Sequence, residues 1–324
     1  MRKLTIILRN IPLLMALCLI SPAIIRAQTD MDAIMMTKNN LCVGPMFGHS
    51  SWKNYWEGTF KRNNQNLGTV STNMYGLMGV YGVTTKLNVL FNLPYVTTNA
   101  SQGTLHGQKG LQDFSLWIKW MPLEKQLGNG LFSIYTLGGF SVPMTNYIAD
   151  YLPLSIGLQS KTLSGRLMVD YQLGNLFATA SGTYTYRSNI TVDETSYYTS
   201  GEHITSDVNM PDMAMLNIRA GYRSERLIAE AVFTKMNTLG GTDIRKNGMP
   251  FPSNKMNSSM LGVNGKYNIK AVAGLSLTGG AYYTLAGRNV GQATGYDLAV
   301  FYILDFTRKA KNPTGHSSKQ SSKK

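Results

Sequence analysis

Apolar and polar residues alternate with a period of two along much of the chain, which is the spacing of a β-strand with one apolar face. The clearest case is residues 176–187, where one face carries Leu, Ala, Gly and Tyr and the other mainly Thr and Ser, with Phe177 as the exception. The same alternation recurs at 114–120, 167–173, 216–222, 261–269 and 298–306. An apolar face of about 10–12 residues that ends in tyrosines suits a strand crossing a bilayer.

The spacing of these stretches predicts about 12 strands in one closed sheet. We expect them at 41–49, 67–81, 86–96, 110–121, 130–142, 161–173, 176–187, 213–223, 226–237, 258–269, 275–286 and 296–306. Gly44-Pro45 interrupts the first of them, which makes it the least regular of the set.

The connecting segments alternate between long and short. The long set is 50–66, 97–109, 143–160, 188–212, 238–257 and 287–295, and the short set is 82–85, 122–129, 174–175, 224–225 and 270–274. Outer-membrane barrels have long loops outside and short turns inside, whereas a soluble β-sandwich, whose strands also alternate, has no reason to sort its loops. We therefore predict an all-β fold, a transmembrane antiparallel up-and-down β-barrel with both ends of the chain on the short-turn side.

Residues 1–27 have the pattern of a secretory signal peptide. Arg2 and Lys3 precede an apolar stretch that is too short to span a bilayer, and Ala27 is a plausible cleavage position. No later segment approaches 18 uninterrupted apolar residues, so helices would not hold the mature chain in a membrane. We expect a signal peptide at 1–27, an outer-membrane barrel at 28–307 and a disordered basic tail at 308–324, with location in the bacterial outer membrane.

Charge supports this interpretation. Charged residues make up 15% of the chain, against about 25% in soluble domains, and a bilayer would remove the need for a charged surface. The net charge of +14 comes largely from four basic residues in 1–27 and six in 308–324, where no acid occurs. A nucleic-acid binder would instead carry a basic face on its folded body, so we expect no nucleic-acid partner.

Strand parity places a set of charged side chains inside the barrel. They are Asp113, Lys119, Arg166, Asp170, Arg187, Arg219, Arg223, Glu230, Lys266, Asp297 and Asp305. The two signs are nearly balanced, which favours neither anions nor cations. The set is either a polar path that acts on a permeant or a network of ion pairs that rigidifies the wall.

Two stretches carry a family resemblance. One is Tyr81-Gly82-Val83-Thr84-Thr85-Lys86, which runs on to Leu93-Pro94-Tyr95, and the other is 110–120, with Gly110, Asp113 and Lys119. Together they resemble the outer-membrane "transporter" barrels named for meta-pathway phenol degradation, which are loosely related to channels for fatty acids and aromatic hydrocarbons. In this chain Gln112 replaces the family's second Gly, and Thr85 stands where an acid is common. In structural terms, Gly82 suits a turn with positive φ, and Pro94 suits the point where pairing stops and a loop begins.

An enzymatic function is a second class to consider. Some barrels of this size are outer-membrane phospholipases that use a Ser and a His on the outer wall, and His49 and Ser51 have a suggestive spacing. No family signature surrounds them, and His106, His203 and His316 fall in loops or the tail. Cys42 is the one cysteine left after Cys18 departs with the signal, so neither an internal disulfide nor a cysteine zinc site is expected. We expect no enzyme, no cofactor and no metal.

The leading hypothesis is a monomeric barrel for passive transport of small molecules, including hydrophobic ones. Its expected partners are outer-membrane lipid and the small-molecule permeant. The alternative is a structural or ligand-binding barrel without transport, whose long loops at 188–212 and 238–257 carry aromatic residues that could contact a ligand. A lipid hydrolase is the third and weakest hypothesis.

Overall fold

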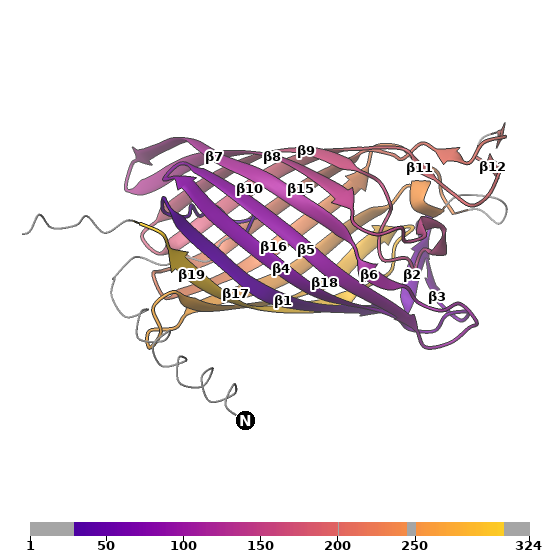
Figure 1. Cartoon of the computed structure of the whole chain (residues 1–324), viewed down its shortest axis with the longest axis horizontal. Helices are drawn as coiled ribbons and strands as arrows, with labels where there is room; N and C mark the ends of the chain where they lie inside the picture. The colour runs from indigo at the N-terminus through magenta and orange to yellow at the C-terminus, as the bar shows by residue number, and fades with distance from the viewer. Residues whose placement is uncertain (1–28, 200, 245–250, 308–324) are drawn as a thin grey trace, which may run out of the picture.

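The structure is a computed structural model that describes residues 29–199, 201–244 and 251–307. The predicted signal peptide at 1–27 and the predicted tail at 308–324 lie outside the described residues. Figure 1 shows long, tilted strands that wrap around a central axis, with the longer loops gathered at one end.

Twelve strands form the wall of a closed antiparallel barrel, as predicted. They are β1 (Asn40–Trp52), β4 (Val70–Thr84), β5 (Leu87–Ala100), β7 (Asp113–Leu127), β8 (Gly130–Pro143), β9 (Thr162–Leu173), β10 (Leu176–Arg187), β15 (Met213–Arg223), β16 (Leu227–Thr238), β17 (Asn257–Asn268), β18 (Leu275–Arg288) and β19 (Thr294–Asp305). Each strand pairs with its neighbours in chain order, and β19 pairs with β1 to close the sheet. Closure leaves the wall without an unpaired edge, which lipid could not satisfy.

The smaller elements all belong to the long connections. Two short strands, β2 (Asn54–Glu57) and β3 (Phe60–Asn63), form a hairpin, and β6 (Lys109–Leu111) extends the pairing of β5. The connection after β10 holds β11 (Ile190–Thr191), β12 (Tyr197–Tyr198), β13 (Glu202–His203) and β14 (Asp207–Val208). Single 3-10 turns lie at η1 (Ala149–Tyr151) and η2 (Phe251–Ser253), and no described helix is long and apolar enough to cross a membrane.

The wall is apolar outside and polar inside. Large apolar side chains on the outer face are exposed; Leu176 is 64% exposed and Val263 61%. The side chain of Lys119, on the inner face, is completely buried. A soluble protein has the opposite arrangement, with its large apolar side chains mostly buried and its charged side chains mostly exposed. The exposed apolar wall therefore requires a bilayer as its solvent.

Two details differ from the sequence predictions. Gly82 does not form a turn with positive φ: it lies inside β4, and the turn is formed by Thr85 and Lys86. Its missing side chain instead admits another part of the chain, since a Cβ at Gly82 would lie 2.1 Å from the carbonyl oxygen of Thr37. Pro94 does not end its strand either, because β5 continues to Ala100 against β4, and only the direct pairing with β7 stops before it, at Asn92.

Gly44-Pro45 also has less effect than expected. The β4 side of β1 pairs without a break from Leu41 to Trp52, while on the β19 side the pairing skips Gly44 and Pro45 and resumes at Met46. A proline can be tolerated in this way because it lacks only the donor toward one neighbour. As a result β1 extends to Trp52 and includes His49 and Ser51, which the sequence placed at the strand's end or beyond it.

Candidate functional site: the lumen and the segment inside it

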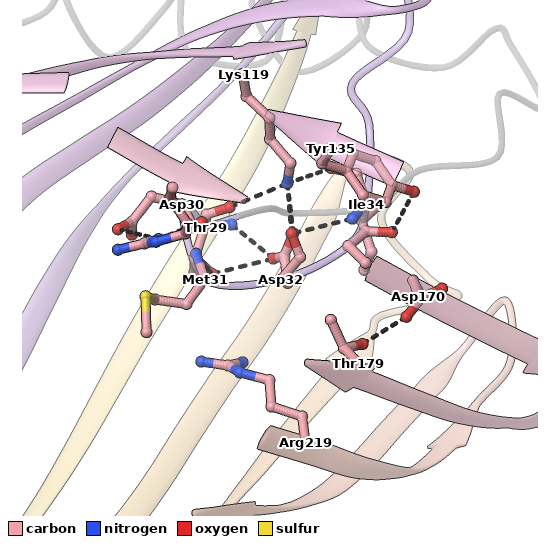
Figure 2. Close-up of polar contacts among 12 residues, drawn as sticks. Thr29, Asp30, Met31, Asp32, Ile34, Lys119, Tyr135, Asp170, Thr179 and Arg219 are labelled. Atoms are coloured by element: carbon pink, nitrogen blue, oxygen red, sulfur yellow. Dashed lines mark hydrogen bonds and ion pairs between the residues drawn. The ribbon is translucent and has the colours of Figure 1, made fainter. Parts of the chain in front are cut away.

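Residues 29–36 do not join the wall but run through the interior of the barrel, where Lys119 binds them (Figure 2). The Lys119 ammonium donates to the carbonyl oxygens of Asp32 at 2.5 Å and Ile34 at 2.8 Å, and it lies 3.2 Å from the Asp32 carboxylate. The carbonyl oxygen of Thr29 lies 3.4 Å away. A fully buried ammonium is tolerated only when its charge is paired and its protons are bonded, and this segment supplies both.

Arg166 makes the second attachment. Its Nη1 atom donates to the carbonyl oxygen of Asp30 at 2.7 Å and lies 3.1 Å from the Asp30 carboxylate. The guanidinium is held in place by the wall, because Nε donates to the Thr183 hydroxyl and the group stacks over the Trp117 ring at 4.8 Å. Two wall cations thus neutralise two neighbouring acids of the internal segment.

The segment also has its own fold and its own apolar contacts. The Asp32 carboxylate accepts hydrogen bonds from the backbone of Thr29 and Ile34, which forms a compact turn. The Tyr135 hydroxyl donates to the carbonyl oxygen of Ala33, while Met36 packs against a lumenal cluster that includes Cys42. Burial of these apolar groups stabilises the bound segment in addition to the ion pairs, so the segment forms an ordered plug in the lumen.

A cavity of about 440 Å³ remains between this plug and the β1, β4 and β15–β19 part of the wall. Its apolar lining includes Met31 from the segment and wall residues that are mostly thioethers and aromatics: Met46, Met74, Met78, Tyr282 and Phe301. Its polar lining includes Asp30 and Asp32 of the segment and, from the wall, His49, Arg219, Arg223, Glu230, Asn264, Lys266 and Asp297. The space thus combines a pliable apolar surface with fixed charges.

The wall charges bordering this cavity are largely paired with one another. Arg219 lies 2.6 Å from Glu230, which also accepts a hydrogen bond from Asn264. Arg223 donates to Asp170 at 2.9 and 3.2 Å, and its guanidinium stacks over the Phe177 ring at 3.8 Å. The structure is therefore compatible with both interpretations of the charged set, because the ion pairs link neighbouring strands of the wall and also border a cavity.

The other predicted residues lie nearer the two ends. Asp113 accepts a hydrogen bond from Tyr147, and Arg187 reaches the carbonyl oxygen of Pro211; both border a second cavity of about 310 Å³. Lys266 is buried, whereas Asp305 is exposed at the last residue of β19 and accepts a hydrogen bond from the Thr307 backbone. Asp305 therefore does not face the enclosed lumen, because the wall ends there.

Loop 144–161 covers the second cavity at the end opposite the short turns. Tyr147 and Ile156 pack with Val96, and the Thr98 hydroxyl donates to the carbonyl oxygen of Leu154 at 2.5 Å. Two causes raise the pKa of the Tyr147 phenol above its ordinary value: burial is the larger, and the hydrogen bond to Asp113 is the second. The phenol stays neutral and keeps donating to Asp113 through the physiological pH range.

Asp243 joins its own loop to the β18–β19 connection at the same end. Its carboxylate accepts hydrogen bonds from Arg288 at 2.5 and 2.8 Å and from Asn289 at 2.8 Å. The Arg288 hydrogen bond is the main cause that lowers the pKa of Asp243 below its ordinary value. A carboxyl with a lowered folded pKa stabilises the fold above its unfolded pKa, near 3.9, and this contribution is lost as pH falls through the folded value.

We therefore expect the described parts of this loop, residues 239–244 and 251–256, to be bound to the end of β18 at neutral pH and released in acid. An acid-active protease should cleave this loop faster as the pH falls below about 4, the ordinary Asp value. The Asp243→Asn variant should be cleaved readily at every pH, because it cannot carry the charge that Arg288 binds. Equal cleavage of both proteins across the range would contradict this assignment.

Sequence reasoning did not anticipate the internal segment. Asp30 and Asp32 bind two of the predicted lumenal cations but are not among the predicted site residues. A signal was present: both acids precede the first strand, in a stretch without strand periodicity, while the predicted lumen held one more base than acids. The position of the segment inside the barrel could not be read from that pattern.

The chain shares its fold with an outer membrane channel. That protein, from Pseudomonas putida F1, superposes with a TM-score of 0.68 at 13% identity, covering 86% of this chain and 100% of the channel. Two autotransporter domains match less well. The NalP translocator domain of Neisseria meningitidis has a TM-score of 0.45 at 9% identity, covering 84% of this chain and 90% of its own. The AIDA-I transport unit of Escherichia coli has a TM-score of 0.44 at 11% identity, and the match covers 85% of this chain and 93% of the transport unit.

No protein-family model matches the chain, and no curated protein matches it. At 13% identity the structural likeness establishes the fold. Function has to be argued from the lumen itself.

Proposed function

We propose that this protein is a channel of the bacterial outer membrane that passes small molecules passively, with a lumen that its own residues 29–36 close. The observation that carries the proposal is the internal segment, which separates an open cavity from the β7–β9 side of the wall. A barrel with a purely structural role could fill its interior with wall side chains and would not need a separate segment. The fold shared with the Pseudomonas putida channel supports the same conclusion.

The lining of the cavity favours permeants with substantial apolar surface. Met46, Met74 and Met78 come from adjacent strands and meet Met31 of the segment across the cavity. Unbranched thioethers adapt to varied shapes, as a path for several related compounds requires. The sequence resemblance of residues 81–95 and 110–120 to phenol-pathway transporter barrels supports the same class of permeant, as do the paired wall charges, which select neither sign.

The outer face supports the proposed location and state. Its exposed leucines, valines and tyrosines would contact outer-membrane lipid around the whole circumference, and the closed wall leaves no strand edge for a second copy to pair with. We therefore propose a monomer in the outer membrane.

Conductance tests the proposal directly. The purified wild-type protein in planar bilayers should be mostly closed, and a variant lacking residues 29–36 should conduct steadily, because removing the segment joins the cavity to the rest of the lumen. Liposomes containing this variant should also take up small aromatic solutes faster than wild-type liposomes. If the shortened protein folds but neither conducts nor takes up solute, the barrel is a structural or ligand-binding protein and the channel is rejected.

A further inference from the structure

Arg187, the last residue of β10, is a lumenal cation that forms no ion pair within the described part of the chain. The lumenal arginines of β9 and β15, by contrast, each lie within ion-pair distance of a carboxylate. The hydrogen bonds of Arg187 are long: Nη1 donates to the carbonyl oxygen of Pro211 at 3.4 Å, and Nη2 lies 3.5 Å from the Met213 sulfur. A guanidinium carries its N–H donors in a planar fork, so several of these donors remain for a ligand.

Asp212 is the acid that could neutralise Arg187, but both of its carboxylate oxygens accept hydrogen bonds from other groups. Oδ1 accepts from the Arg187 backbone N–H at 3.1 Å, and Oδ2 accepts from the Tyr184 hydroxyl. Tyr184 is 51% exposed on the outer face of the wall, whereas Arg187 faces the lumen. The guanidinium is therefore left with only a carbonyl oxygen and a thioether as its partners.

Arg187 borders the second cavity, which has a volume of about 310 Å³ and can take a small organic molecule. The polar lining consists mainly of hydroxyl groups, from Ser160, Thr162, Ser164, Thr183 and Thr185. The apolar lining is Trp117, Leu158, Met213 and Met215. The Thr183 oxygen accepts a hydrogen bond from Arg166 Nε at 2.7 Å, which leaves the hydroxyl proton to donate. The cavity therefore combines a cation and uncharged hydrogen-bond donors with an apolar surface.

Two other charged side chains border this cavity, and both are already bound. Arg166 lies 3.1 Å from the Asp30 carboxylate of the internal segment. Asp113 accepts a hydrogen bond from the Tyr147 hydroxyl at 2.6 Å, and it belongs to β7, which β8 and β9 separate from β10. The charge that a ligand can still neutralise beside β10 is therefore that of Arg187.

We propose that the second cavity binds a small organic carboxylate with an apolar body, and that Arg187 holds the carboxylate through its planar fork. Paired N–H···O bonds of this kind are stronger than hydrogen bonds between neutral groups, and their geometry matches a carboxylate. Thr183 and Thr185 share the inner face of β10 with Arg187 and offer further donors. Met215 and Met213 pair with them from β15 and provide an adaptable apolar surface for the body of the ligand.

The position of the cavity relates this site to the proposed channel. Arg187 ends β10 at the end of the barrel that carries the longer loops (Figure 1), which faces the outside of the cell in outer-membrane barrels. A solute that arrives from outside would therefore meet this cavity before the internal segment. The site names a class of permeant for the proposed channel, and it rests on that function for the passage of the ligand but not for its binding.

Isothermal titration calorimetry of the purified full-length protein in detergent tests this site, with hexanoate as the probe and hexanamide as its uncharged analogue. Wild type should bind hexanoate about tenfold or more tightly than hexanamide, since hydrogen bonds to a charged partner are stronger than those between neutral groups. Arg187→Met should weaken hexanoate binding about tenfold or more and remove the difference between the two probes. Arg187→Lys should bind hexanoate with intermediate affinity, because an ammonium keeps the charge but loses the fork.

Lys161→Met is the matched control, because Lys161 is an exposed cation at the same end of the barrel and does not border the cavity. This variant should bind hexanoate as wild type does. Urea unfolding should show that Arg187→Met is as stable as wild type, since Arg187 has no ion pair to lose. The proposal is overturned if folded wild type binds hexanoate no more tightly than hexanamide, or if Arg187→Met keeps the wild-type affinity. Neither measurement involves conductance, so a failure of the site is distinguishable from a failure of the channel.

Discussion

Replacing Lys119 with Met should release the internal segment and convert a mostly closed barrel into a conducting one. Methionine fills a similar volume, but it leaves the Asp32 carboxylate and the carbonyl oxygens of Asp32 and Ile34 without their donor. Removing one partner of a buried ion pair costs about 3–5 kcal/mol, because the remaining charge is left uncompensated. The ratio of released to bound segment should therefore rise about a hundredfold or more.

Two measurements check this result. Met36 is 2% exposed when the segment is bound, so a Met36→Cys variant in a Cys42→Ala background should react with a water-soluble maleimide only when Lys119 is also replaced. Planar-bilayer conductance should rise in parallel. Lys125→Met is the matched control, since Lys125 is an exposed residue of the same strand. If the cysteine stays protected in the Lys119→Met protein, the lysine does not hold the segment.

Replacing Asp170 with Ala should destabilise the barrel by about 3–5 kcal/mol, measured as the free energy of unfolding in detergent with urea. Asp170 accepts two hydrogen bonds from Arg223 and one from Thr179, at 2.5 Å. The Arg223 side chain is 4% exposed and would remain buried without its counterion. The Asp170→Asn variant should lose less, because its amide oxygen can still accept from Thr179 and Arg223.

The control for this prediction is an exposed ion pair of the same protein. Glu57 and Arg62 lie 2.6 Å apart in the β2–β3 hairpin, and their side chains are 34% and 50% exposed. Water screens such a pair, so Glu57→Ala should cost less than about 1 kcal/mol. A similar small loss for Asp170→Ala would mean that water enters the lumen and solvates Arg223.

The wall of the barrel could be predicted from the sequence because its pattern is local. A strand between lipid and lumen must alternate apolar and polar residues, so the periodicity at 176–187 or 161–173 locates the strands to within a few residues. The same parity places Lys119, Arg166, Asp170, Arg219, Arg223 and Glu230 on the inner face without knowledge of their partners.

Which groups those residues contact was decided by the tertiary structure. Lys119 binds backbone atoms and a carboxylate more than 80 positions away in the sequence. The sequence does not record such a pairing, because any acid on any neighbouring element could satisfy the same charge. Gly82 shows the same limit. The sequence suggests a turn there, whereas in the structure the missing side chain lets the Thr37 backbone lie against the strand.

The sequence by itself determined that this chain forms a closed barrel with an apolar outside, since lipid imposes one repeating requirement on every strand. The tertiary structure decided what occupies the interior and which outer-wall residues meet. Residues 29–36 lack strand periodicity, and their place in the lumen depends on Lys119 and Arg166 projecting inward from β7 and β9. Asn73 reaches His49 because β1 and β4 pair in one particular register, which is fixed by contacts along their whole length.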